Sequence, residues 1–219
     1  MSAESSTGRR SRRPLIIAAA AVLVAGLIAA GVGVLTGEPA AAKLAYTHLP
    51  TPCTLLAPGT VARYLPGASS SPAQASPGGA STVGACTWSS TAGGEDRTAI
   101  LQVAMYGSLA GTSSAQRAYA KEVPAGNCRC RGYTVTRQAV AGLGDDATVL
   151  FTTAGTQAGT GSWATPAVNL LVRSGNADIN VGYTVAGLGH SPAPPDRAEL
   201  RAATSAMARD VLAALSRPS

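Results

Sequence analysis

The most reactive side chains of this sequence are four cysteines, which fall into two groups. Cys53 and Cys86 stand apart, whereas Cys128 and Cys130 flank a single arginine, Arg129. A Cys-Arg-Cys segment suits either a redox pair, with thiolates favoured by neighbouring arginines, or a structural disulfide in a loop. We favour the structural disulfide, because redox motifs usually place two residues between their cysteines. Metal binding is disfavoured, since no histidine or further cysteine lies at ligand spacing.

Four cysteines allow three disulfide pairings. Cys128 and Cys130 are close enough in sequence to pair locally, which would leave Cys53 to pair with Cys86. A bridge across one intervening residue is geometrically tight, so the other two pairings stay open. A bridge between Cys53 and Cys86 would contribute on the order of 4 kcal/mol in the chain-entropy model.

Neither histidine has a patterned acidic or nucleophilic neighbour. His48 precedes the folded region and His190 lies in a Gly/Pro-rich segment, so we interpret both as exposed loop residues. The alternative is a hydrolase that uses His190 with a distant serine or aspartate. Asp145 and Asp146 are adjacent, and in an extended chain they point in opposite directions, so they do not share a proton as a catalytic dyad does. The sequence predicts no catalytic, cofactor-binding or metal-binding residue.

A possible ligand surface is formed by Arg129, Arg131 and Trp163. With Arg137, the two arginines make a modest basic cluster that suits an anionic envelope polymer or lipid headgroups. Trp88, two residues after a cysteine, is expected in the core. The formal net charge is +6, but half of it comes from four arginines and one glutamate in the first 37 residues. The charge therefore does not predict a nucleic-acid partner.

An apolar run occupies residues 14–37, which contain no charged side chain. A helix of this length covers the roughly 30 Å hydrocarbon layer of a membrane. Four arginines precede the run and Glu38 follows it, so residues 1–13 are expected to remain cytoplasmic, with the rest of the chain beyond the membrane. The alternative is a secretory signal cleaved after Ala42, although signal apolar regions usually run about 7–15 residues. Both interpretations place the remaining chain outside the cytoplasm.

Beyond a tether of residues 38–51, residues 52–219 are long enough to bury one core. Residues 66–82 are rich in Ser, Ala, Pro and Gly and are expected to form a mobile loop. Helices are expected at 58–65, at 113–123 and after Asp196, with Glu199 completing an acidic capping box. Strand patterns occupy residues 83–89, 99–106, 133–140, 147–152, 167–173 and 178–185.

The expected fold class is therefore α+β. We expect a mainly antiparallel sheet of about five or six strands, packed by a C-terminal amphipathic helix and preceded by one N-terminal transmembrane helix. In that last helix, apolar residues recur every three or four positions, which predicts one face packed against the sheet.

Three short motifs share residue types with one known family: Pro-Cys-Thr-Leu-Leu at 52–56, Cys-Thr-Trp at 86–88 and Gly-Leu-Gly-Asp-Asp-Ala at 142–147. They resemble an actinobacterial family of extracytoplasmic proteins, the domain of unknown function 3558, many of whose members are lipoproteins. The resemblance spans most of residues 52–215. It implies a cell-envelope location and a structural bridge between Cys53 and Cys86, and it implies no activity. This chain departs from the family pattern by lacking the lipidation cysteine and by adding Cys-Arg-Cys.

Together, these observations predict a single-pass, membrane-anchored extracytoplasmic domain that binds, senses or assists a partner in the cell envelope. The expected partners are the membrane, an envelope polymer or another membrane protein. Two alternatives remain: the hydrolase that uses His190, and a thiol redox module that uses Cys128 and Cys130.

Overall fold

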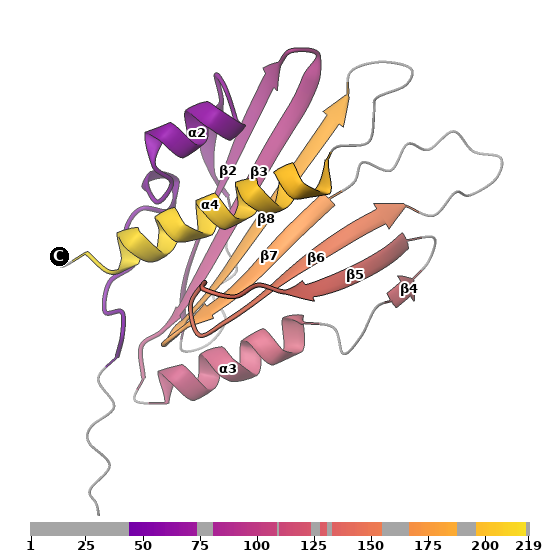
Figure 1. Cartoon of the computed structure of the whole chain (residues 1–219). Coiled ribbons are helices and arrows are strands. Elements are labelled where there is room, and N and C mark those ends of the chain that lie inside the picture. Colours follow the sequence, from indigo (N-terminus) through magenta and orange to yellow (C-terminus); the bar gives the residue numbers. More distant parts are fainter. Residues whose placement is uncertain are drawn as a thin grey trace, which may run out of the picture. The chain divides into compact units, whose positions relative to one another are not determined.

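An antiparallel sheet of eight strands forms the centre of the described structure, in the order β1-β2-β3-β8-β7-β6-β5-β4 (Figure 1). The structure is a computed structural model and describes residues 44–73, 81–108, 110–123, 128–130, 133–154, 167–187 and 196–217. The strands are β1 (Ser69–Ala73), β2 (Ser81–Ala92), β3 (Glu95–Tyr106), β4 (Cys128–Cys130), β5 (Tyr133–Ala139), β6 (Asp146–Ala154), β7 (Ala167–Ser174) and β8 (Ala177–Gly187).

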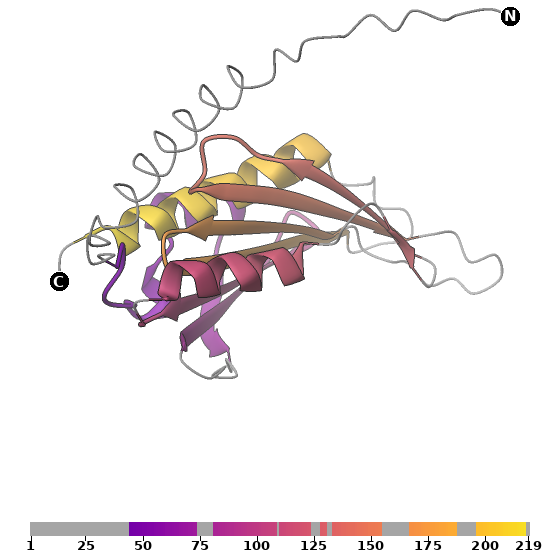
Figure 2. The same ribbon diagram turned by 90° about the horizontal axis from the view of Figure 1, so that it is seen from below.

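Helices lie on both faces of this sheet (Figure 2). The long helix α4 (Arg197–Leu215) packs on β7 and β8, and α2 (Pro58–Tyr64) contacts α4. The short helix η1 (Pro52–Thr54) joins the same layer, while α3 (Gly111–Glu122) contacts β3, β7 and β8 on the opposite face.

Side-chain burial alternates along β8, and this alternation gives the sheet two different faces. Ile179, Val181 and Tyr183 are almost fully buried beneath α4, because alternate residues of a strand point to the same side. The residues between them, including Asn180 and Gly182, point to the face that carries α3 and are only partly buried. The core therefore lies between the sheet and α4, and the other face stays largely polar.

The predicted α+β class, antiparallel sheet and C-terminal helix are confirmed, but the predicted number of strands is too low. All six predicted strands are present, and β1 and β4 are added at the two edges. The sequence does not predict β1, because its residues, Ser-Ser-Ser-Pro-Ala, show no alternation of apolar and polar side chains. An edge strand needs only backbone pairing on one side, and β1 obtains it from β2, with Ser71 opposite Thr87. The predicted mobile loop is therefore wrong for 69–73 and 81–82, while 74–80 lie outside the described residues.

The start of α4 confirms the predicted N-cap. The side chain of Asp196 accepts a hydrogen bond of 2.8 Å from the backbone N–H of Ala198. Glu199 instead turns toward the sheet, where its Oε1 lies 3.5 Å from Nη1 of Arg97. The first turn of α4 is thus tied both to its own backbone and to β3.

The segment 44–50, assigned to a tether from the sequence, contributes a side chain to the core. Tyr46 is 9% exposed, and its backbone N–H donates to the Oδ1 of Asn176 over 2.9 Å. The amide nitrogen of Asn176 donates in return to the backbone oxygens of Tyr46 and Tyr106, at 2.9 and 3.1 Å. Asn176, in the turn between β7 and β8, therefore holds the incoming chain against the sheet.

Within the described ranges, no helix combines the length and the apolar character needed to cross a membrane. The predicted anchor at residues 14–37 lies outside those ranges.

Candidate functional site

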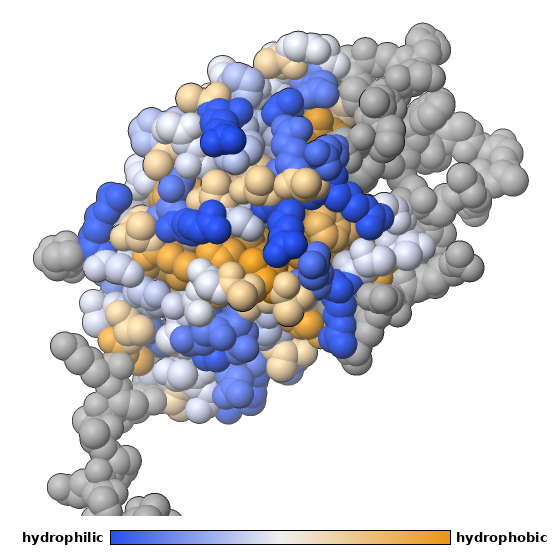
Figure 3. All heavy atoms as spheres, in the orientation of Figure 1, coloured by the Kyte–Doolittle hydropathy of each residue, from blue (hydrophilic) through white to orange (hydrophobic). Residues whose placement is uncertain are grey.

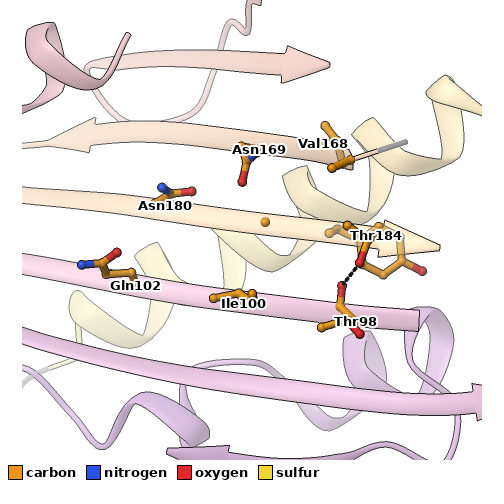
Figure 4. A pocket seen from close by; sticks show the side chains of 10 residues that line it. Thr98, Ile100, Gln102, Val168, Asn169, Asn180 and Thr184 are labelled. Carbon is orange, nitrogen blue, oxygen red and sulfur yellow. Dashed lines mark hydrogen bonds between the residues drawn. The ribbon is translucent and has the colours of Figure 1, made fainter. Parts of the chain in front are cut away.

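A hollow of about 160 Å³ opens on the face of the sheet opposite α4, beside the region covered by α3. It lies over β3, β8 and β7, the three central strands (Figure 4). The side chains around it are uncharged: Thr98, Ile100, Gln102, Asn169, Asn180 and Thr184. Its volume is below the roughly 300–1,000 Å³ of typical small-molecule pockets. The hollow therefore suits one group of a larger ligand rather than a whole enclosed substrate.

The floor of the hollow exists because position 182 is glycine. In the sheet register, Gly182 lies between Ile100 on β3 and Asn169 on β7. A Cβ atom at this position would approach Oδ1 of Asn169 to 3.0 Å. Any larger side chain would occupy the hollow, so the absence of a side chain at Gly182 creates the space.

Three amide side chains surround this floor without partners of their own. In the described part of the chain, Gln102, Asn169 and Asn180 make no side-chain hydrogen bond. Each amide offers two donors and one acceptor oxygen. Thr184 is weakly engaged, since its hydroxyl donates to the backbone oxygen of Thr98 over 3.5 Å (Figure 4). The hollow thus presents unused hydrogen-bonding capacity of both polarities and no charge.

Ile100 adds an apolar surface to this polar setting. Its side chain is 51% exposed, and among the described residues it is the exposed large hydrophobic residue. Beyond it, the hydroxyl-bearing residues Ser71 and Thr87 lie in register with Ile100 across β1 and β2. The row from Ser71 to Asn169 crosses five strands, which at about 4.8 Å per step extends roughly 19 Å.

A buried carboxyl group lies on the same face, close to α3. Asp178, two residues before Asn180, is 8% exposed, and neither carboxyl oxygen has a hydrogen-bond partner of ordinary geometry in the described structure. Burial, followed by the negative charge of Glu122, raises the pKa of Asp178 to about 7. The Tyr106 hydroxyl and Arg173 oppose this rise more weakly. The group is titratable near neutral pH, but it does not line the hollow.

Acid–base or nucleophilic chemistry finds no support in this arrangement. The described residues that line the hollow include no histidine, carboxylate, cysteine or lysine. In the described lining, no base lies beside the threonine hydroxyls to activate them. Within the residues that the structure describes, no group of three potential metal-ligating side chains occurs. Among the described residues, the hollow therefore offers hydrogen-bonding groups and an apolar side chain.

The structure confirms a disulfide between Cys53 and Cys86, which links η1 to β2 across 33 positions. Trp88 is buried close to it, at 3% exposure. Cys128 and Cys130 belong to β4, which pairs with β5, but their side chains lie outside the described part. Their mutual pairing and the redox alternative remain predictions.

The predicted ligand residues are only partly described. Arg129 lies opposite Thr134 in the register of β4 and β5, whereas Arg131 and Trp163 lie outside the described residues. His190 also lies outside them, and His48 is exposed in the segment before η1. Asp145 and Asp146 do not form a dyad, because both pair with Arg173, at 3.0 and 2.7 Å.

The residues of the hollow were missed in the sequence, although a weak signal existed. Asn180, Gly182 and Thr184 alternate with Ile179, Val181 and Tyr183 in the sequence, a pattern that is typical of the outward positions of a half-buried strand. Outward positions of a solvated strand usually carry some charge, and these carry amide, glycine and hydroxyl groups instead. Only the register brings them next to Gln102 and Asn169.

Comparison with known proteins adds no family: no protein-family model, no curated protein and no solved structure matches this chain.

Proposed function

We propose that this protein is a membrane-anchored extracytoplasmic module that binds a neutral glycan along the face of its sheet opposite α4, beside α3. The observation that carries the proposal is the set of three unpartnered amides, Gln102, Asn169 and Asn180, around the hollow above Gly182. Sugar hydroxyls both donate and accept hydrogen bonds, as side-chain amides do. An uncharged site favours an uncharged ligand, because nothing there offsets the cost of desolvating a charge.

The dimensions of the surface support an extended ligand. The hollow is small, but the row from Ser71 to Asn169 gives about 19 Å of uncharged surface. A polymer lying along this row would place one substituent in the hollow and one apolar group on Ile100. An N-acetylated sugar suits both requirements, since its acetamido group has an amide for Asn169 and Asn180 and a methyl group for Ile100.

Two observations support the extracytoplasmic location. The apolar run at 14–37 follows four arginines, a charge bias typical of a cytoplasmic N-terminus. The disulfide between Cys53 and Cys86 is of a kind that persists in oxidising compartments. A reporter enzyme that is active only outside the cytoplasm, fused after Ser219, should be active in intact cells; activity from a cytoplasm-dependent reporter alone would contradict the proposed location.

Binding is tested with the full chain in detergent, titrated with a tetramer of N-acetylglucosamine by calorimetry. We expect saturable binding that weakens at least tenfold in Gly182→Val, because the valine side chain fills the hollow. Gly107→Ala is the matched control, since a Cβ at this exposed position meets nothing within 4 Å. A second pair compares Gln102→Ala with Gln138→Ala, which removes the same side chain from the opposite face of the sheet.

Binding that is lost in Gly182→Val and Gln102→Ala but kept in both controls would support the proposal. Absence of saturable binding in the wild type would contradict it. An equal loss of affinity in Gln102→Ala and Gln138→Ala would also contradict it, because the ligand would then not recognise the hollow.

A further inference from the structure

A second hollow lies on the α4 face, between β5 and the first two turns of α4. Its volume is about 390 Å³, within the roughly 300–1,000 Å³ of typical ligand clefts. The lining includes Thr136 and Gln138 of β5, Phe151 of β6, and Arg197 and Arg201 of α4. Figure 3 shows strongly hydrophilic residues gathered around this end of α4. The character of this hollow is therefore cationic, unlike that of the hollow above Gly182.

The two arginines project from one side of α4, and Arg197 packs on the sheet. Arg197 and Arg201 are four residues apart in α4, so their side chains leave the helix on the same side. The guanidinium carbon of Arg197 lies over the ring of Phe151, 5.5 Å from its centroid. Phe151 itself is 8% exposed, so this aromatic floor is fixed by the core.

Neither of these arginines has an acidic partner in the described structure. The two acidic residues of the same helical turn are engaged elsewhere, since Asp196 caps the backbone of α4 and Glu199 pairs with Arg97.

The other clustered arginines behave differently. Arg97 pairs with Glu95 at 2.7 Å, and Arg173 pairs with Asp145 and Asp146. Each of these two sheet arginines therefore has a carboxylate partner. The pair in α4 instead has the Phe151 ring as an aromatic floor, with Thr136, Arg137 and Gln138 of β5 beside it. Because the described lining contains no carboxylate, the guanidinium donors of the pair are open to a ligand.

We propose that this hollow binds an anionic group, a carboxylate or a phosphate, on an extracytoplasmic ligand. The planar guanidinium of arginine presents donors that match the paired oxygens of either group. The hydroxyl of Thr136 and the amide of Gln138 supply neutral hydrogen bonds to the rest of the ligand. This site lies on the opposite face of the sheet from the proposed glycan surface, and its existence does not depend on that proposal.

The test titrates the full chain in detergent, at low salt, with citrate in one arm and pyrophosphate in the other. Calorimetry measures affinity, and NMR of the arginine Nε–Hε groups reports which arginines are contacted. The double variant Arg197→Gln/Arg201→Gln removes the site. The double variant Arg209→Gln/Arg217→Gln is the control, because it removes the same charge from exposed positions farther along the same helix and after its end.

We expect at least one anion to bind with saturation and to shift the signals of Arg197 and Arg201. Affinity should fall at least tenfold in the site variant and stay within twofold in the control. The arm that binds more tightly identifies the group as carboxylate or phosphate. Equal weakening in both variants would overturn the proposal, since the attraction would then follow net charge alone. Absence of saturable binding of both anions to the wild type would also overturn it, and thermal unfolding of the variants verifies that both remain folded.

Discussion

Replacing Asp178 with asparagine should make the stability of this domain less dependent on pH. The pKa of this buried carboxyl is raised from 3.8 to about 7, first by burial and then by the charge of Glu122. As pH rises above 3.8, the unfolded chain releases this proton while the folded chain keeps it. The folded state therefore binds more protons than the unfolded state, and stability falls with rising pH until both forms are ionised above about 7.

The magnitude follows from the same pKa values. A shift of one pKa unit corresponds to about 1.4 kcal/mol of stability. Between pH 5 and pH 7, the free energy of unfolding can therefore fall by at most about 2.7 kcal/mol. Water and adjustment of α3 around the ionised group screen part of this cost, so we expect a measured loss of about 1–2 kcal/mol between pH 5 and pH 8. Asparagine has a similar shape and no charge, so Asp178→Asn should lose this slope and exceed the wild type in stability at pH 8.

Urea unfolding of the full chain at pH 5 and pH 8 measures the effect, followed by tryptophan fluorescence. Asp96→Asn is the matched control, because Asp96 is exposed and accepts a hydrogen bond from Thr91 over 2.7 Å. The control should keep the pH slope of the wild type. Identical slopes for wild type and Asp178→Asn would refute the reasoning, as they would show that Asp178 is already ionised in the folded protein at pH 5.

Three further changes should each lower the free energy of unfolding by a distinct mechanism, measured by urea unfolding at pH 7. Removing the disulfide with Cys53→Ala/Cys86→Ala should cost about 4 kcal/mol, because a loop of 33 positions is no longer closed in the unfolded chain; an unchanged midpoint would contradict this. Asp196→Ala should cost about 1 kcal/mol through loss of the cap of α4, with reduced helical circular dichroism if the helix frays. Gly144→Ala should cost about 2 kcal/mol or more, because φ is +59° and the new Cβ would collide with the backbone oxygen of Arg173; a neutral effect would mean that the turn relaxes freely.

Local patterns in the sequence are sufficient to predict most helices and strands of the fold. Alternating residues predicted β8, and the apolar spacing with Asp196 predicted α4, since burial of one face imposes a period on the residues. The disulfide between Cys53 and Cys86 was anticipated as one of three pairings, and the structure selects it. The edge strand β1 was not predicted, because backbone pairing at an exposed edge requires no particular side chain.

The two proposed binding surfaces depend mainly on the tertiary structure. Gln102, Asn169 and Gly182 are far apart in the chain, and only the order β3-β8-β7 and its register place them together. The pair Arg197 and Arg201 is visible in the sequence as helical spacing, but the aromatic floor beneath it comes from β6. The periodicity of a sequence reports which way each side chain faces, whereas the neighbours of that side chain depend on strand order, which is set by packing across the whole sheet.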